Sequence, residues 1–226
     1  MNIFAIAIDG PAGSGKSTVA KKIAGVLNIV YIDTGAMYRS VALYCINKGI
    51  STKDGVAVSN VLHEISLKIE LEDNRQIIFL NGENVTLKIR TQEIGQGASD
   101  VGTIFTVREY LVGLQRELAK NQSVVMDGRD IGTNVLPDAK IKIYLSADVK
   151  ERAKRRQKEL DQMGISSDLE EIETQIKGRD FNDMNRKYNP LRKADDAIEV
   201  DTTHMTIDEV CDTIINITKA RLKEME

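Results

Sequence analysis

The sequence is poor in several residue types that particular classes of protein require. Among its 226 residues there is no tryptophan, and aromatic residues make up only 4%. So few aromatic rings argue against a broad stacking platform for single-stranded nucleic acid. The two cysteines, Cys45 and Cys211, cannot build a disulfide framework, and no metal-ligand spacing surrounds them. We therefore expect a cytoplasmic protein whose thiols stay reduced.

Long hydrophobic runs and an excess of one charge are also missing. The first apolar run, residues 3–8, is too short to span a bilayer, and no basic segment precedes it. We therefore expect neither a membrane anchor nor a signal peptide. Lys plus Arg number 31 and Asp plus Glu number 34, which gives a formal net charge of −3. This balance excludes a globally basic surface for nucleic acid, but it leaves room for a local cluster of cations.

Short apolar runs alternate with amphipathic segments along most of the chain. The first fifty residues predict strand, helix, strand and helix in succession, and the same rhythm resumes after residue 105. Such alternation is typical of an α/β fold with a central parallel sheet. The predicted strands cover residues 4–8, 30–32, 124–126, 141–145 and 198–200. The predicted helices cover 16–27, 36–47, 106–120 and 207–223, with a charged helical zone over 148–187 that Gly164 interrupts.

Between these halves the pattern changes to that of a small antiparallel unit. A helix predicted over 54–65 is followed by strands over 67–71 and 77–80, with a turn at Asp73-Asn74. Asn81-Gly82 is a strong hairpin signal leading into residues 83–85. We predict one domain with an inserted subdomain over 51–90. Its core would comprise residues 1–50, 91–147 and 190–226, and residues 148–189 would form a lid and the helix after it.

A phosphate-binding sequence lies between the first predicted strand and the first predicted helix. It fits G-x-x-x-x-G-K-[ST], whose glycines let backbone N–H groups face phosphate oxygens at a helix N-terminus. Lys16 would bridge the outer phosphates, and the Ser17 hydroxyl would be a ligand of Mg²⁺. A plain glycine-rich turn is the alternative, and Lys16, Ser17 and the flanking elements together argue against it. The predicted ATP-binding residues are Gly10, Pro11, Ala12, Gly13, Ser14, Gly15, Lys16, Ser17 and Thr18.

This loop identifies a nucleotide site rather than a reaction, because ATPases, GTPases and small-molecule kinases share it. The dinucleotide pattern G-x-G-x-x-G is not met, and no guanine-reading N-K-x-D is present. The apolar strand over 124–126 ends at Asp127, where P-loop proteins commonly hold Mg²⁺ or its waters; a capping or turn Asp is the alternative. Arg129 and Asp130 follow at the strand end where open α/β sheets bind ligands.

Several segments resemble bacterial cytidylate kinases, which are nucleoside monophosphate kinases of the P-loop type. They are residues 10–18, 33–39, 89–93, 127–132 and Arg179-Asp180, in that family's order and across nearly the whole chain. The resemblance implies a three-layer P-loop kinase fold with a central parallel sheet, an inserted monophosphate-binding subdomain with a small antiparallel sheet, and a helical lid. It also implies transfer of the γ-phosphoryl group from ATP, with Mg²⁺, to CMP or dCMP.

The resemblance further implies which residues hold the acceptor nucleotide. The chemistry agrees, because a carboxylate at Asp130 can accept from the exocyclic amine of cytosine, and arginine forks match phosphate oxygens. Arg179, Asp183 and Arg186 would share one helix face, although an ordinary ion-paired surface has the same spacing. The implied CMP-binding residues are Thr34, Arg39, Ser99, Arg108, Arg129, Asp130, Arg179, Asp183 and Arg186.

Positive charge near the transferred group would come from the same set and from the lid. A closing lid rich in arginine would stabilise the migrating charge and exclude water. The expected catalytic residues are Lys16, Arg129, Arg179, Arg152 and Arg156, with Mg²⁺ held by Ser17 and, through water, by Asp127.

Two other functions remain open from the residues alone. One is a P-loop kinase for another nucleoside monophosphate, and the other is a nucleotide-gated RNA-binding module. Carboxylates interleaved along the lid argue against the RNA interpretation. We expect a monomer that binds ATP and CMP or dCMP, and no nucleic acid polymer or membrane.

Overall fold

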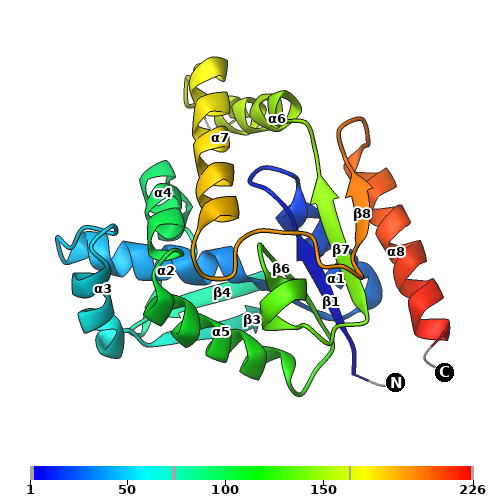
Figure 1. Ribbon diagram of the computed structural model, residues 1–226, viewed down its shortest axis with the longest axis horizontal. Coiled ribbons are helices and arrows are strands. Elements are labelled where there is room, and N and C mark those ends of the chain that lie inside the picture. Colours follow the sequence, from blue (N-terminus) through cyan, green and yellow to red (C-terminus); the bar gives the residue numbers. More distant parts are fainter. Residues whose placement is uncertain (1–2, 73–74, 163, 225–226) are drawn as a thin grey trace.

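A five-stranded parallel sheet forms the centre of the computed structural model, which describes residues 3–72, 75–162 and 164–224 (Figure 1). The strand order is β2-β6-β1-β7-β8, and every residue of β6 is buried, as expected for a strand covered on both faces. The predicted central parallel sheet is confirmed. Its strands are β1 (Ala5–Asp9), β2 (Val30–Asp33), β6 (Val124–Gly128), β7 (Ile141–Ser146) and β8 (Ile198–Asp201).

Helices cover both faces of this sheet because successive side chains of a strand point to opposite faces. Ile6 and Ile8 of β1 pack in one cluster with residues of α1 (Lys16–Leu27) and α8 (Ile207–Lys223). Ala7 lies in another cluster with Val112 of α5 (Phe105–Ala119). Figure 1 shows α8 and α5 on opposite sides of the strands. The predicted three-layer α/β arrangement is therefore confirmed.

A three-stranded antiparallel sheet lies beside the main one, in the order β3-β4-β5. Its hairpin turns at Asn81 and Gly82, whose φ angles of 50° and 84° suit the tight turn that the sequence predicts. The other predicted turn, Asp73-Asn74, lies outside the described residues. The core of this sheet is continuous with α2 (Thr34–Asn47), so the division at residues 51 and 90 stays a prediction. The strands are β3 (Leu67–Glu72), β4 (Arg75–Leu80) and β5 (Glu83–Asn84).

The helix predicted over 54–65 is shorter in the structure. Asp54 caps α3 (Gly55–Val61) by accepting hydrogen bonds from the backbone N–H groups of the first turn, and η1 (Leu62–Glu64) follows as a tighter turn. The predicted start is therefore correct to one residue, and the last turn is a 3₁₀ turn before the chain enters β3.

Two helical segments were not predicted, and both border the main cavity. α4 (Gln92–Val101) is capped by the Thr91 side chain and follows the short turn η2 (Lys88–Arg90). The five-residue π-helix η3 (Ile131–Val135) follows β6 directly. η3 is too short to show an apolar period, and in α4 the apolar residues Ile94, Ala98 and Val101 have helical spacing but stand among glycines and polar residues.

The charged zone over 148–187 forms two helices, α6 (Val149–Gln162) and α7 (Leu169–Asn185), which pack together above the sheet (Figure 1). The predicted interruption at Gly164 is confirmed, and this residue has a φ of +73°. The predicted end at Lys187 is two residues too late, because Arg186 already has extended backbone angles. Within the described residues, no helix combines the length and apolarity needed to cross a membrane.

Candidate active site

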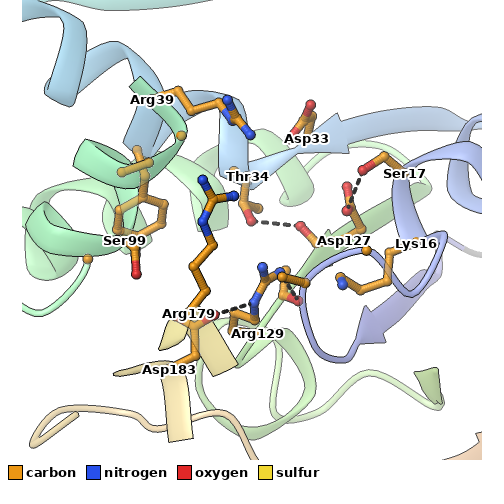
Figure 2. Close-up of a pocket in the computed structure, with 18 of the residues that line it drawn as sticks. Lys16, Ser17, Asp33, Thr34, Arg39, Ser99, Asp127, Arg129, Arg179 and Asp183 are labelled. Carbon is orange, nitrogen blue, oxygen red and sulfur yellow. Dashed lines mark hydrogen bonds and ion pairs between the residues drawn. The ribbon is translucent and has the colours of Figure 1, made fainter. Parts of the chain in front are cut away.

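A cavity of about 480 Å³ opens at the carboxyl ends of β1, β2 and β6. The loops after parallel strands meet at this edge of a sheet, which is why open α/β folds bind ligands there. Side chains from α2, α4, α5, α6 and α7 contribute to the lining. Figure 2 shows those of α2, α4 and α7, among them Arg39, Ser99 and Arg179. Segments that are far apart in the sequence therefore share one cavity.

The glycine-rich loop connects β1 to α1 and turns tightly against the neighbouring strand β7. A Cβ placed on Gly10 would lie 2.1 Å from the backbone oxygen of Leu145, so only glycine fits there. Gly13 and Gly15 have φ angles of 74° and 87°, which glycine adopts without steric cost. Gly15 is the N-cap of α1, so the backbone N–H groups of the first helical turn face the cavity edge.

Lys16 lies buried inside the curve of this loop. Its Nζ donates to the backbone oxygen of Pro11 at 2.5 Å and to Ser14 Oγ at 3.2 Å. Burial, with the Arg129 guanidinium nearby, holds the pKa of Lys16 below its ordinary value, while Asp127 opposes that shift. The Lys16 amino group therefore lies between the Arg129 guanidinium and the Asp127 carboxylate, at the loop where a polyphosphate would bind.

Ser17 and Asp127 form an oxygen-rich corner next to Lys16. Ser17 Oγ donates to Asp127 Oδ2 at 3.2 Å, and Tyr31 donates to Asp127 Oδ1 at 2.8 Å. Burial and the neighbouring Asp33 carboxylate raise the pKa of Asp127. A hydroxyl and a buried carboxylate are hard oxygen donors of the kind that Mg²⁺ prefers, and a cation beside them would offset the charge repulsion. The residues present therefore fit a magnesium site.

Asp33 is the second carboxylate of this corner. It lies opposite Asp127 in the β2–β6 register, caps α2 through Ala36 N–H, and pairs with Arg90 at 2.9 Å. Both Asp33 and Arg90 line the cavity. The sequence interpretation assigned neither residue a role, although Asp33 ends its strand just as Asp127 does. Arg90 lies in the segment 89–93 that carries the family resemblance, but its pairing with Asp33, 57 positions away, has no local sequence signal.

Asp130 is the centre of a buried polar cluster at the other end of the cavity. Arg108, only 2% exposed, donates to Oδ2, and Arg186 donates to Oδ1 at 3.0 Å. Asn134 of η3 also donates to Oδ2, at 3.0 Å. Among the described residues Oδ1 accepts one hydrogen bond, so a lone pair remains available to a ligand. Sequence reasoning missed Asn134.

Two arginines meet where α2, α4 and α7 approach one another. Figure 2 shows the guanidinium groups of Arg39 and Arg179 close together above Thr34. A Cβ on Gly95 of α4 would lie 3.2 Å from Arg39 Nη1 and 3.3 Å from Arg179 Nη2, so glycine makes room for both. Burial, with Arg90 nearby, lowers the pKa of Arg39 to about 10. Such a concentration of like charge is suited to an anionic ligand.

Several donors in this region are buried without a partner. Within the described part of the chain, Ser99 Oγ, Arg108 Nε and Arg179 Nε make no hydrogen bond. Buried polar groups are nearly always paired, so an unpaired set lining one cavity is a sign of a ligand. These atoms come from three different helices.

Arg129, which follows β6, connects the two ends of the cavity. Its Nε donates to Asp183 Oδ2 of α7 at 2.7 Å, a contact that Figure 2 marks. Thr34 Oγ1 donates to the backbone oxygen of Asp127 at 2.7 Å, which fixes the start of α2 beside the same strand. The predicted convergence of Arg179, Asp183 and Arg186 is present, but Arg186 reaches the cavity from the residue after α7 rather than from a helical turn.

The lid arginines do not all lie as expected. Arg156 lines the cavity and pairs with Glu159 at 3.0 Å, and Arg155, a lid arginine outside the expected catalytic set, lines it too. Arg152 does not line the cavity: it is 6% exposed, and its guanidinium is held by Asp180 at 2.6 Å and by the backbone oxygen of Ala12. The donors of Arg152 hold protein acceptors in this structure, and its expected contact with the transferred group stays a prediction.

Most of the other predicted residues line the cavity, but Gly10, Pro11 and Ser14 of the glycine-rich loop are not among its lining residues. The cavity is lined by P-loop residues, among them Lys16 and Ser17, and by every residue predicted to bind the acceptor. The members of that second group are Thr34, Arg39, Ser99, Arg108, Arg129, Asp130, Arg179, Asp183 and Arg186.

Known proteins resemble this chain along nearly its whole length. The family model described as cytidylate kinase matches residues 6–220. A cytidylate kinase of Caldicellulosiruptor bescii is 50% identical over 212 residues, which cover 94% of each chain. A cytidylate kinase of Lactobacillus johnsonii is 48% identical over 221 residues, covering 98% of this chain and 96% of that one.

Among solved structures, an uncharacterised protein from Eubacterium ventriosum is similar in fold. Its TM-score is 0.53 at 15% sequence identity, with 97% of this chain and 99% of that chain covered. At this identity the similarity concerns the fold alone. The family model and the relatives at about half identity settle the relationship: the chain belongs to the cytidylate kinase family.

Proposed function

We propose that this chain transfers the γ-phosphoryl group of ATP to CMP and dCMP, giving CDP and dCDP with ADP. The observation that carries the proposal is the group of arginines across the cavity from Lys16. Arg39, Arg129 and Arg179 gather there, and Arg179 Nε is buried without a partner. A second phosphate seated on these guanidinium groups would face the phosphates of a nucleotide in the glycine-rich loop.

The donor nucleotide is expected to sit with its phosphates in the glycine-rich loop. The N–H groups at the start of α1 favour anionic oxygens, and Lys16, now turned onto Pro11 O, would exchange that contact for a phosphate oxygen. Ser17 would hold Mg²⁺ directly, and Asp127 would hold it directly or through water. When bound, this ion would neutralise the charge of the phosphate groups.

The transfer needs positioning and charge stabilisation rather than a covalent intermediate. An acceptor phosphate is already an anion near neutral pH, so no strong general base is required. Its oxygen would attack the γ-phosphorus in line while Lys16, Arg129, Arg156 and Arg179 stabilise the charge on the equatorial oxygens. These side chains come from the start of α1, the segment after β6, and helices α6 and α7, so their convergence depends on the fold.

The base would be selected in the cluster around Asp130. The free lone pair on Oδ1 suits the exocyclic amine of cytosine, and Arg108 Nε and Ser99 Oγ are buried donors for its ring nitrogen and carbonyl. Uracil presents an oxygen where cytosine has the amine, so it would set an acceptor against a carboxylate. Asp183, which lies between the base cluster and Arg129, is placed to accept from a ribose hydroxyl.

Two finer points belong to this proposal. Cys45 and Cys211 are both free and buried, which agrees with a cytoplasmic location. A monomeric state stays a prediction.

The proposal is tested by ADP release from purified protein with a panel of acceptors, with and without Mg²⁺. We expect CMP and dCMP to be the fastest acceptors and the reaction to need Mg²⁺. Faster ADP release with AMP or shikimate would point to a different small-molecule kinase. Tight RNA binding with no CMP-dependent ADP release would favour the RNA-binding alternative, which the family relationship disfavours.

A further inference from the structure

The two helices above the sheet are tied to the glycine-rich loop through the backbone of one residue, Ala12. Asp180 of α7 accepts from the backbone N–H of Ala12 at 3.0 Å through Oδ1. Arg152 of α6 donates to the backbone oxygen of Ala12 at 2.8 Å. The two side chains also pair with each other, Arg152 Nη1 to Asp180 Oδ2 at 2.6 Å. Both polar groups of Ala12 are therefore held from outside the loop.

This clamp, which consists of Arg152, Asp180 and the backbone of Ala12, is buried. Asp180 is 8% exposed and Arg152 is 6% exposed. Arg152 Nε is further fixed by the backbone oxygen of Ala147 at 3.0 Å. Hydrogen bonds between charged and backbone groups in a dry site are stronger and more directional than those on the surface. The ion pair therefore holds the peptide groups on both sides of Ala12 in defined orientations.

We propose that Asp180, together with Arg152, is a positioning pair that presets the glycine-rich loop for the phosphates of ATP. The reason is geometric. Ala12 lines the cavity, and Gly13, the next residue, passes so close to Arg152 that a Cβ there would lie 3.5 Å from Arg152 Cβ. Fixing the peptide groups before and after Ala12 fixes where the curve of the loop begins. The N–H groups that follow then face inward before a nucleotide arrives, which lowers the cost of ordering them on binding.

The position of Asp180 on α7 separates its role from that of its neighbour. Arg179 points into the acceptor region, near Arg39, whereas Asp180 contacts the donor loop. Adjacent residues of one helix thus serve the two halves of the cavity. Loss of Asp180 should weaken the binding of ATP and leave the binding of CMP largely intact.

The test is the affinity for AMP-PNP with Mg²⁺, measured by calorimetry, together with KM for ATP and KM for CMP. We expect Asp180→Ala to raise the Kd of AMP-PNP roughly tenfold or more, because a buried charged hydrogen bond is lost, and to change KM for CMP less than about twofold. Arg152→Ala should behave alike. The double variant should be no worse than about the worse single one, since either substitution breaks the clamp.

Matched controls lie on the same two helices. Glu170→Ala on α7 and Lys154→Ala on α6 remove exposed charges, and both should leave all three constants unchanged. If Asp180→Ala does not fold, Asp180→Asn carries the test. Its amide oxygen can still accept from Ala12 N–H, but its amide nitrogen would face the donors of Arg152, so a smaller loss of AMP-PNP affinity is expected.

An unchanged Kd for AMP-PNP in folded Asp180→Ala would overturn the proposal. Equal increases in the constants for ATP and CMP, together with a lower Tm, would also overturn it, because they would indicate a purely structural residue. The proposal rests on the donor half of the proposed function only. If the wild-type chain binds AMP-PNP but does not phosphorylate CMP, the proposed function fails while this test still decides the role of Asp180.

Discussion

The donor and acceptor halves of the cavity are built in different ways. The donor half is local: residues 10–18 form the loop after β1 and the first turn of α1, and Asp127, Arg152 and Asp180 contact this segment from elsewhere in the chain. The acceptor half is assembled from α2, α4, α5, β6 and α7, whose residues meet only in the folded chain. A short sequence motif can therefore encode the binding of the donor phosphates. Selection of an acceptor depends instead on how several helices and strands are placed relative to one another.

The largest expected effect comes from the donor half. Lys16→Ala should lower kcat by roughly 10²–10³-fold or more, because it removes a charge from the transferring phosphates. The measurement is the rate of ADP release at saturating CMP. The matched control is Lys22→Ala, whose side chain lies on the surface of the same helix and pairs with Asp208. Nearly full activity of the Lys16→Ala enzyme would show that this lysine does not contribute to phosphoryl transfer.

The next effect comes from the acceptor half and concerns its selectivity. Asp130→Asn should reduce kcat/KM for CMP by about 10²-fold and leave the Kd of AMP-PNP within about twofold, since one direct base contact is lost and the neighbouring arginines lose their counter-charge. Asp138→Asn, an exposed carboxylate in the loop after η3, is the control. Equal losses of kcat/KM for CMP and of affinity for AMP-PNP would indicate that Asp130 is structural. The donor and acceptor halves of the cavity would then not be separable by this substitution.

A smaller effect is expected where α4 makes room for the arginines. Gly95→Val should raise KM for CMP about tenfold, because its side chain would push against Arg39 and Arg179, which lie within 3.3 Å of the new Cβ. KM for ATP should not change. Gly113→Ala, on the open surface of α5, is the control. An unchanged KM for CMP would mean that these arginines are not held where the acceptor phosphate binds.

The smallest effect is expected at Asn134, which supports Asp130 from η3. Asn134→Ala removes one of three donors to that carboxylate and should lower kcat/KM for CMP about two- to fivefold, since Arg108 and Arg186 still hold it. Asn121→Ala, on the exposed segment before β6, is the control. A loss as large as that of Asp130→Asn would show that one neutral donor, rather than the arginines, sets the position of the carboxylate.

The same contrast explains which elements could be predicted. The loop, α1 and α8 follow from local signals: glycines before Lys16, apolar spacing, and a capping box at Thr206 and Glu209. α4 escaped prediction because its sequence is polar and holds Gly95 and Gly97. Its stability comes from packing, since a Cβ on Gly97 would lie only 3.0 Å from Ala42 of α2.

Side-chain roles were harder to predict than elements. Arg152 and Arg156 lie four positions apart on one helix, and their residue type gives both the same expected role. Their surroundings differ in the structure. Asp180, 28 positions away, pairs with Arg152, whereas Arg156 lines the cavity. Asn134 and Arg90 likewise gain their roles from partners that no local pattern reveals.

The central claim is that the acceptor half selects cytosine nucleotides. It is tested most directly by kcat/KM for CMP, dCMP, UMP and AMP with wild-type protein and saturating MgATP. The account predicts that CMP and dCMP exceed UMP and AMP by at least about tenfold, because only cytosine offers an amine to Asp130 where uracil offers an oxygen. A kcat/KM for UMP or AMP that equals or exceeds that for CMP would contradict the account.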